Sequence, residues 1–274
     1  GKVLIKDVKF LVVDEADRML DMGFIPDIIK INKLLPKIRQ TLFFSATLSK
    51  EIRKIGKDLL INPKEITIDN YYSTSKNIDS IFIKTNNKNK MNDLKTLLCI
   101  DNVKSAVIFC NKKSDIDKVN NFLKRNNFKT VCLHGNLDQN LRIKSLEKFK
   151  DKTVEILIAS DVAARGIDIN GLSHVFNFDV PNNPEDYIHR IGRTGRAGNK
   201  GKAYTIFDKN DEKNIFLIEK LIKKKVNKIF IDDFVSSQKL SNQKFTQIKN
   251  SKNKAKHKSK IKPNLLPVEN FLNF

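Results

Sequence analysis

Short apolar runs rich in β-branched residues alternate with longer amphipathic segments along most of the 274-residue chain. This alternation is typical of α/β proteins, in which helices connect the strands of one sheet. Because each apolar run from Ala106 onward is followed by a segment long enough for a crossover helix, we expect a mainly parallel sheet with right-handed connections. The expected strands are Phe10–Val13, Thr41–Phe44, Ile66–Ile68, Ile81–Ile83, Ala106–Phe109, Thr130–Leu133, Glu155–Ala159, His174–Phe178 and Ala203–Phe207.

The amphipathic segments predict the helices. Ile25–Leu35 should end before Pro36, and Ser49 precedes a segment with Ile52, Ile55 and Leu59 on one helical face, so it is placed to cap that helix. Further helices are expected at Lys112–Asn126, Asn140–Phe149, Glu185–Ile191 and Asp211–Lys223.

Changes in composition predict the domain organisation. Polar, Asn-rich sequence between Asn70 and Asn92 favours a hinge, so we expect a short first region at residues 1–72 and an α/β domain at residues 73–233. After Asp233 the apolar pattern ends, and residues 239–264 hold nine lysines and no acidic residue. Residues 234–274 should therefore form a basic, largely disordered tail. It is either a solvated extension or an arm that contacts RNA without sequence preference.

The charge balance points to polyanionic partners. A formal net charge of +21 and a pI near 9.8 favour nucleic acid first and an anionic membrane surface second, although a base-composition bias towards Lys and Asn would also raise the charge. The three cysteines show no C-x-x-C spacing, which suggests neither a disulfide framework nor a zinc site. No apolar run approaches the roughly 20 residues that span a bilayer. We expect a cytoplasmic protein without a membrane partner.

Three carboxylates follow the first apolar strand. Asp14, Glu15 and Asp17 stand directly after Phe10–Val13, and ligands of open parallel sheets bind at the carboxyl ends of strands. One carboxylate there can hold the Mg²⁺ of a bound nucleoside triphosphate, and a second can orient or deprotonate the attacking water. An ordinary acidic loop would give the same pattern, so the cluster alone leaves both interpretations open.

An arginine-rich segment lies far along the chain. HRIGRTGRAG (His189–Gly198) places Arg190, Arg193 and Arg196 three residues apart with glycines between them. Guanidinium groups so spaced can converge on one phosphate from a single side, in the manner of an arginine finger. A surface RNA contact is the alternative.

Two more polar loops follow apolar strands. The apolar run at residues 155–159 is followed by Ser160, Asp161, Arg165 and Asp168, and the run at residues 42–44 is followed by Ser45 and Thr47. We expect these polar groups at the same edge of a parallel sheet. Polar loops gathered at one edge build a cleft.

Six motifs stand in the order and approximate spacing of the DEAD-box RNA helicases of superfamily two, which the chain resembles from Asp14 to Arg196. The sequence DRMLDMGF (residues 17–24) and the Lys-rich tail resemble those of bacterial RhlE-type members. The motifs are DEAD (Asp14–Asp17), SAT (Ser45–Thr47), VIF (Val107–Phe109), QNLR (Gln139–Arg142), SDVAARGID (Ser160–Asp168) and HRIGRTGR (His189–Arg196).

The resemblance implies two RecA-like domains that close on ATP and single-stranded RNA, and it implies roles for individual residues. Asp14 and Glu15 would bind the Mg²⁺ of ATP and orient or deprotonate the hydrolytic water. Arg193 and Arg196 would reach the γ-phosphate. Gly166 and Asp168 would lie against the nucleotide. Ser45 and Thr47 would couple hydrolysis to RNA release, and His189 with Asp17 would bridge the domains. Gly135, Arg142 and Ser160 match positions that touch the RNA backbone. Ser160 stands where the family usually has Thr, which keeps the hydroxyl.

One family element is missing from the sequence. The family's phosphate-binding loop, G-x-x-x-x-G-K-[ST], precedes the DEAD motif, and here only thirteen residues precede Asp14; the nearest approach to the loop, Gly198–Ala203, has the wrong spacing. We therefore expect the carboxyl-terminal portion of a longer ATP-dependent RNA helicase, with a remnant of the first RecA-like domain and a nearly complete second one. The alternatives are a non-catalytic RNA-binding module and, more distantly, a DNA-directed relative.

The expected ligands and partners follow from the same resemblance. They are ATP with Mg²⁺, RNA held through sequence-independent backbone contacts, and proteins of ribosome assembly or RNA decay. The 274-residue chain alone should bind RNA in a salt-dependent way without hydrolysing ATP.

Overall fold

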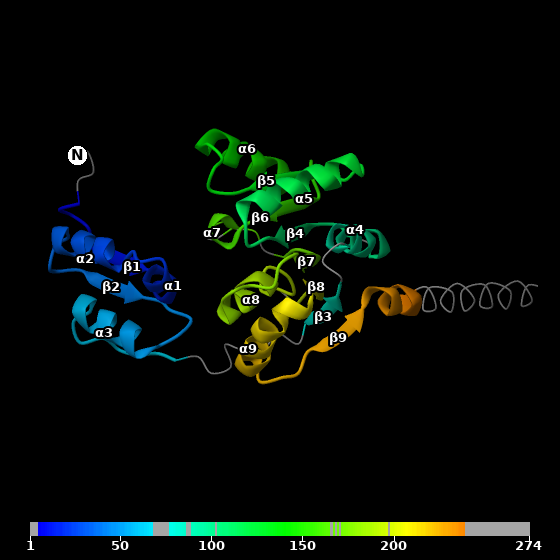
Figure 1. Ribbon diagram of the computed structural model, residues 1–274. Helices are drawn as coiled ribbons and strands as arrows, with labels where there is room; N and C mark the ends of the chain where they lie inside the picture. Colours follow the sequence, from blue (N-terminus) through cyan, green and yellow to red (C-terminus); the bar gives the residue numbers. More distant parts are fainter. Residues whose placement is uncertain are drawn as a thin grey trace, which may run out of the picture. The chain divides into compact units, whose positions relative to one another are not determined.

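The computed structural model describes residues 5–67, 77–85, 89–101, 103–164, 167, 169, 171–196 and 198–238 (Figure 1). The chain divides between Tyr71 and Tyr72 into two compact units, which we call unit 1 and unit 2. Among the described residues, none of the helices has the length and apolar character needed to cross a membrane.

Unit 1 is a two-stranded parallel sheet with helices packed against it. Its core is formed by Ile25, Ile52, Ile55 and Leu59, and the predicted cap is confirmed because Ser49 Oγ accepts a hydrogen bond from the Ile52 N–H at 3.2 Å. The elements are β1 (Phe10–Val13), α1 (Ala16–Asp21), α2 (Ile25–Leu34), β2 (Gln40–Phe43) and α3 (Lys50–Leu59).

The sheet of unit 1 buries only one of its faces among the described residues. Successive side chains of a strand point to opposite faces, and the register pairs Val12 with Leu42. Phe43 packs on the helices, whereas Phe10 is 64% exposed and Val12, Leu42 and Phe44 are exposed as well. These four residues form what we call the open face of unit 1.

Unit 2 is built on a seven-stranded sheet in the order β5-β6-β4-β7-β8-β3-β9, and every pair of neighbours is parallel. The predicted parallel α/β fold is confirmed. The strands are β3 (Ile78–Lys84), β4 (Ala106–Phe109), β5 (Thr130–Leu133), β6 (Ile156–Ala159), β7 (His174–Asn177), β8 (Gly201–Phe207) and β9 (Asn227–Phe230).

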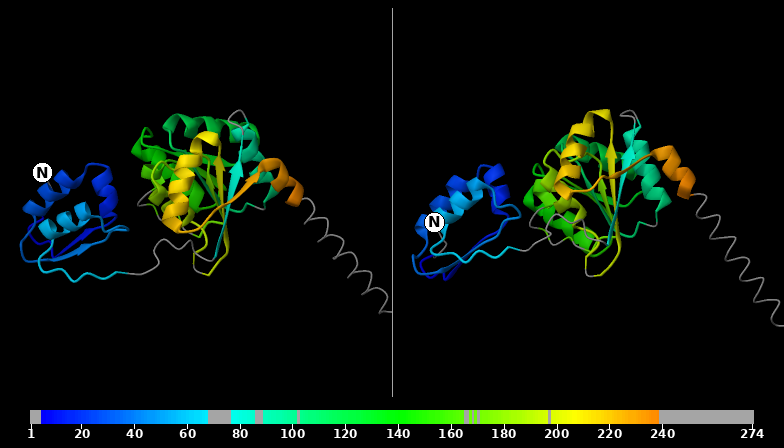
Figure 2. Two further views of the ribbon diagram at one scale, coloured as in Figure 1. Left: turned by 60° about the horizontal axis from the view of Figure 1, so that its bottom comes forward. Right: turned by 90° about the horizontal axis from the view of Figure 1, so that it is seen from below.

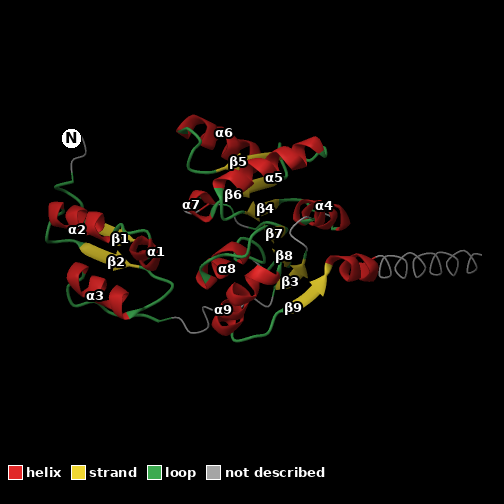
Figure 3. Cartoon of the chain, in the orientation of Figure 1, coloured by secondary structure: helices red, strands yellow, loops and turns green. Residues whose placement is uncertain are grey.

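Helices cover both faces of this sheet, as Figures 2 and 3 show. Because both faces are buried, the central strands read as continuous apolar runs: Val107 belongs to one hydrophobic cluster and Ile108 to the other. One cluster includes residues of α4 (Lys90–Ile100) and α5 (Lys113–Arg125). The other includes residues of α6 (Gln139–Lys150), α7 (Asp161–Ala164), α8 (Pro184–Ile191) and α9 (Glu212–Ile222), which follows the short 3₁₀ helix Lys209–Asp211.

Three expectations about elements need correction. The strand at Ile66–Ile68 is wrong for Ile66 and Thr67, which are exposed and outside any strand, while Ile68 lies outside the described residues. The strand β9 was missed because its polar sequence, NKIF, belongs to an edge position with little to bury. Helices α1, α4 and α7 were also missed.

The packed part of unit 2 extends beyond Asp233. A helical segment runs through residues 231–238, and Phe234 is 4% exposed with its ring centroid 5.7 Å from that of Tyr204. The expected tail therefore cannot begin at residue 234. The rest of it, residues 239–274, lies outside the described part of the chain.

The half-buried Asp101 carboxylate links the end of α4 to the neighbouring strands β7 and β8 of unit 2. Asp101 forms an ion pair with Lys202 at 2.7 Å, lies 3.4 Å from His174 Nε2, and accepts a hydrogen bond from the Tyr204 hydroxyl. Burial opposes ionisation of Asp101, but hydrogen bonds from His174, Lys202 and Tyr204 outweigh it and lower the pKa of the carboxyl.

We expect Asp101→Asn to lower the free energy of unfolding of unit 2 by about 1.5–3 kcal/mol at neutral pH, the usual contribution of hydrogen bonds to a charged group. Because the folded-state pKa of Asp101 is lowered, its contribution is complete above the unfolded-state pKa of about 3.9 and is lost as the pH falls below it. Urea unfolding at several pH values should show the difference between the proteins shrinking in acid. The exposed Glu147 offers a control, Glu147→Gln, and an equal effect of Asp101→Asn at all pH values would contradict the assignment.

Candidate functional site

The DEAD segment begins where β1 ends. Asp14 is exposed and Glu15 half-buried, and the Glu15 N–H donates to Asp14 Oδ1 at 2.8 Å. Glu15 has φ 50° and ψ 47°, in the left-handed region that residues other than glycine seldom adopt. Such backbone strain costs about 1–3 kcal/mol and gathers at functional sites. The turn therefore sets two successive acidic residues at the carboxyl end of β1.

Asp17 joins the DEAD segment to the SAT segment. Its side chain is buried, and Oδ2 accepts hydrogen bonds from the Thr47 N–H at 2.9 Å and the Thr47 hydroxyl at 3.2 Å. Ser45 Oγ accepts from the Asp17 N–H at 3.3 Å and donates to the Thr47 carbonyl at 2.7 Å. These three sequence-predicted residues lie together, and the loops that follow β1 and β2 are locked to each other.

Arg190 does not lie with the other two arginines of its motif. It is 1% exposed, and its Nε and Nη2 atoms donate to the two carboxylate oxygens of Asp161, each at 2.7 Å. This is the bidentate geometry in which arginine–carboxylate pairs are strongest. The prediction that Arg190 can converge on a phosphate with Arg193 and Arg196 is therefore wrong, because its guanidinium is taken up inside the fold.

Arg190 connects α8 to the carboxyl ends of three central strands. Nη2 also donates to Asn111 Oδ1 after β4 at 2.7 Å, and Nη1 donates to the Asp179 carbonyl after β7 at 2.7 Å. Asp179 in turn pairs with Lys90 at 2.8 Å. Sequence reasoning gave Asn111, Asp179 and Lys90 no role, although Asn111 and Asp179 follow apolar strands as Asp14 does.

The remaining motif residues of α8 lie at or after its carboxyl end. His189 and Arg193 are half-buried and Arg196 is exposed; Arg193 Nη1 donates to the Ile167 carbonyl at 3.4 Å, and Arg196 Nε donates to the Gly192 carbonyl. Gly195 has φ 68°, and a Cβ there would collide with the Ile78 side chain, so this turn requires glycine. The turn leaves the Arg196 side chain open to solvent.

The residues expected to contact RNA follow β5 and β6. Register pairs Leu133 with Ala159, so exposed Gly135 and half-buried Ser160 lie at the same edge of the sheet. Arg142 is half-buried on α6. The two residues expected to contact the nucleotide, Gly166 and Asp168, lie outside the described residues.

Two protein families match the chain. The family described as "Helicase conserved C-terminal domain" matches residues 89–198, and the family described as "DEAD/DEAH box helicase" matches residues 1–55. Among curated proteins, the ATP-dependent RNA helicase CshA of Listeria monocytogenes is 42% identical over 80% of this chain and 42% of its own length. The DEAD-box ATP-dependent RNA helicase CshA of Bacillus subtilis is 38% identical over 83% of this chain and 46% of its own length. The chain thus spans less than half the length of these relatives.

Solved structures give the same relationship. S. cerevisiae Dbp5 bound to RNA and ADP BeF3 is 30% identical with a TM-score of 0.78, over 88% of this chain and 64% of that one. The C-terminal domain of the DEAD-box protein Dbp5 is 30% identical with a TM-score of 0.56, over 62% of this chain and 99% of that one. The E. coli DEAD-box protein SrmB, solved with the regulator of ribonuclease activity A, is 31% identical with a TM-score of 0.54, over 58% of this chain and 94% of that one.

Proposed function

Because the chain belongs to the DEAD-box family of RNA helicases, we propose that it is part of an enzyme that couples ATP binding and hydrolysis to the local unwinding of RNA duplexes. The observation that carries the proposal is the hydrogen-bonded link of Asp17 to Ser45 and Thr47. A rearrangement of the carboxylate loop after nucleotide hydrolysis would pass directly to the SAT loop through this link. We therefore assign Ser45 and Thr47 to the coupling of hydrolysis to RNA release.

Asp14 and Glu15 are the proposed groups for Mg²⁺ and the hydrolytic water. Carboxylate oxygens are the donors that Mg²⁺ prefers, and exposed Asp14 offers them at the carboxyl end of β1, so the residues present fit the ion. When bound, Mg²⁺ would neutralise charge on the phosphates of ATP. The Glu15 carboxylate, held beside Asp14 by the turn, would orient the water and accept its proton.

Arg193 and Arg196 are the proposed arginine groups for the γ-phosphate. Their guanidinium groups remain charged at any physiological pH and suit the bidentate binding of phosphate oxygens. Both follow the carboxyl end of α8, which the buried Arg190 anchors. By family resemblance, Gly166 and Asp168 would lie against the nucleotide, and Asp17 and His189 would take part in coupling.

RNA would be held through its backbone. Gly135 allows a phosphate to approach the main chain closely, Arg142 supplies charge, and the Ser160 hydroxyl can bond a phosphate or a ribose. None of these groups reads a base edge, so binding should not depend on sequence.

We also propose that the phosphate-binding loop is supplied by a longer polypeptide. The open face of unit 1 supports this, because Phe10, Val12 and Phe44 leave apolar surface that further elements of a RecA-like domain would cover. The greater length of the relatives agrees.

The 274-residue chain should bind single-stranded RNA with an affinity that falls linearly on a logarithmic salt scale, by a slope of about 0.7 for each phosphate neutralised. Fluorescence anisotropy with labelled oligonucleotides of uridine and of adenosine should give similar affinities. Arg142→Ala should reduce the slope by about one phosphate contact, whereas Glu147→Gln on the same helix should not. Salt-independent binding, or equal competition by single-stranded DNA, would contradict the RNA site.

A further inference from the structure

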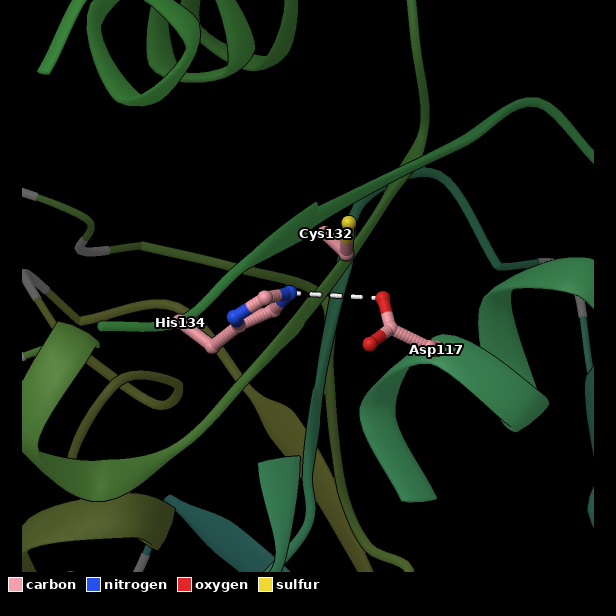
Figure 4. Close-up of side chains that lie close together, drawn as sticks. All are labelled: Asp117, Cys132 and His134. Atoms are coloured by element: carbon pink, nitrogen blue, oxygen red, sulfur yellow. Dashed lines mark hydrogen bonds and ion pairs between the residues drawn. The ribbon is translucent and has the colours of Figure 1, made fainter. Parts of the chain in front are cut away.

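Three side chains that carry typical metal ligands lie together in unit 2, and one of them, His134, directly precedes Gly135. The donor atoms of Asp117, Cys132 and His134 all lie within 4.8 Å of one another (Figure 4). His134 Nε2 is 3.3 Å from Asp117 Oδ1. The sequence did not predict that these three residues form a site, because they belong to no pair of closely spaced cysteines and to no histidine motif.

The local structure explains why these residues meet. Side chains alternate along a strand, so Thr130, Cys132 and His134 project from the same face of β5 and its extension. That face packs on α5, where the Asn120 side chain accepts a hydrogen bond from Thr130 Oγ1 at 2.7 Å. Asp117 stands three residues before Asn120, nearly one helical turn away, and so reaches the next pair of strand positions.

We propose that Asp117, Cys132 and His134 bind one Zn²⁺ ion. In tetrahedral zinc sites the metal lies about 2.0–2.2 Å from nitrogen and carboxylate oxygen, so two such ligands stand about 3.4 Å apart. The observed separation of His134 Nε2 from Asp117 Oδ1 is 3.3 Å. Cys132 Sγ lies within 4.8 Å of the other two donor atoms. A thiolate binds about 2.3 Å from zinc, which puts it about 3.6 Å from the other ligands, so Cys132 would have to move closer by up to about 1 Å to complete three protein ligands.

The donor set selects zinc over the hard cations. Mg²⁺ and Ca²⁺ prefer oxygen ligands, whereas the thiolate, imidazole and carboxylate offered here are all ligands of Zn²⁺. Three protein ligands leave the fourth tetrahedral position for water. A metal ion would reach the cluster from the Asp117 side, because the Asp117 side chain is 55% exposed while that of His134 is 7% exposed.

The Asp117 carboxylate places a negative charge at the cluster, which would attract a cation. Burial raises the pKa of the Cys132 thiol, and the nearby Asp117 carboxylate raises it further, while Lys124 acts in the opposite direction. A bound divalent ion would relieve the repulsion between the thiolate and the carboxylate, and the thiol proton would leave to solvent.

Without metal, the three residues have a simpler arrangement. The Asn136 N–H donates to His134 Nδ1 at 3.3 Å, so the ring proton resides on Nε2 and is donated to Asp117. Zinc at Nε2 would move that proton to Nδ1, and the long contact from Asn136 would be given up. A structural hydrogen bond between His134 and Asp117 alone is the competing explanation.

Titration of the reduced 274-residue chain with Co²⁺, which replaces Zn²⁺ and absorbs visible light, tests the proposal. We expect one equivalent to bind with a thiolate-to-cobalt charge-transfer band, and Zn²⁺ to displace it. Cys132→Ser should remove the band. Cys99→Ser should keep it, because Cys99 is an exposed cysteine outside the cluster.

Asp117→Asn gives a second test at an exposed position that tolerates substitution. It should weaken Zn²⁺ binding by at least about tenfold, and Zn²⁺ should raise the thermal unfolding midpoint of the wild-type chain but not of this variant. Absence of the charge-transfer band in the wild type, its survival in Cys132→Ser, or equal Zn²⁺ affinity in Asp117→Asn would each overturn the site in favour of the hydrogen bond alone.

Discussion

Replacing Arg190 by methionine is expected to lower the free energy of unfolding of unit 2 by about 3–5 kcal/mol, because removing one partner of a buried ion pair leaves the other uncompensated. Arg190 is 1% exposed and binds Asp161 through two hydrogen bonds of 2.7 Å. The substitution also leaves Asn111 Oδ1 and the Asp179 carbonyl without this donor. A loss of this size is a large part of the stability of an ordinary domain.

Tyrosine fluorescence during urea unfolding measures this loss. The chain has no tryptophan, and two of its four tyrosines, Tyr187 and Tyr204, are buried in unit 2. The matched control is Arg125→Ala, an exposed arginine at the end of α5, which should cost less than about 1 kcal/mol.

A double variant separates the charge pair from the packing around it. Replacing both partners, Arg190→Met with Asp161→Leu, should be less destabilising than Arg190→Met alone, because no unpaired charge remains. Equal stability of Arg190→Met and the wild type would show that Arg190 does not anchor α8.

Replacing Arg193 by alanine in the longer polypeptide proposed above is expected to lower RNA-stimulated ATP turnover by about 10³-fold or more, the contribution of an arginine that contacts the transferring phosphoryl group. The proposal places this guanidinium on the γ-phosphate, where charge develops in the transition state. Arg193→Lys should not restore activity, because lysine lacks the planar pair of donors.

Steady-state ATP hydrolysis with saturating single-stranded RNA measures the effect, and unchanged urea unfolding would show that the variant is folded. Arg125→Ala serves again as the control, since it removes an equal charge from the exposed end of α5. A turnover within a few-fold of the wild type in Arg193→Ala would remove Arg193 from the catalytic site.

Strands with a strong local signal were predictable from the sequence. β1, β4 and β5 have the predicted bounds because each is a short run rich in apolar and β-branched residues that begins directly after a polar residue. Parallel pairing followed from the crossover segments. The helix α3 was predictable from its cap at Ser49 and its apolar spacing.

Features that depend on tertiary contacts were not predictable. β9 is stabilised by pairing with β3 rather than by its own composition, and the exposed Ile66 shows that an apolar residue need not mark a strand. The three motif arginines were indistinguishable in sequence, and only the tertiary positions of Asp161, Asn111 and Asp179 distinguish Arg190 from the others. The meeting of Asp117 with Cys132 and His134 likewise depends on how α5 packs on β5.

The central claim is that this chain belongs to an ATP-dependent RNA helicase whose carboxylates at Asp14 and Glu15 take part in hydrolysis. It is tested most directly by measuring ATP hydrolysis of the full-length polypeptide with and without single-stranded RNA, beside its Glu15→Gln variant and the 274-residue chain. We predict RNA-stimulated hydrolysis by the full-length polypeptide, a loss of about 10²–10⁴-fold in Glu15→Gln, and none by the 274-residue chain. No hydrolysis by the full-length polypeptide, or full activity in Glu15→Gln, would contradict the claim.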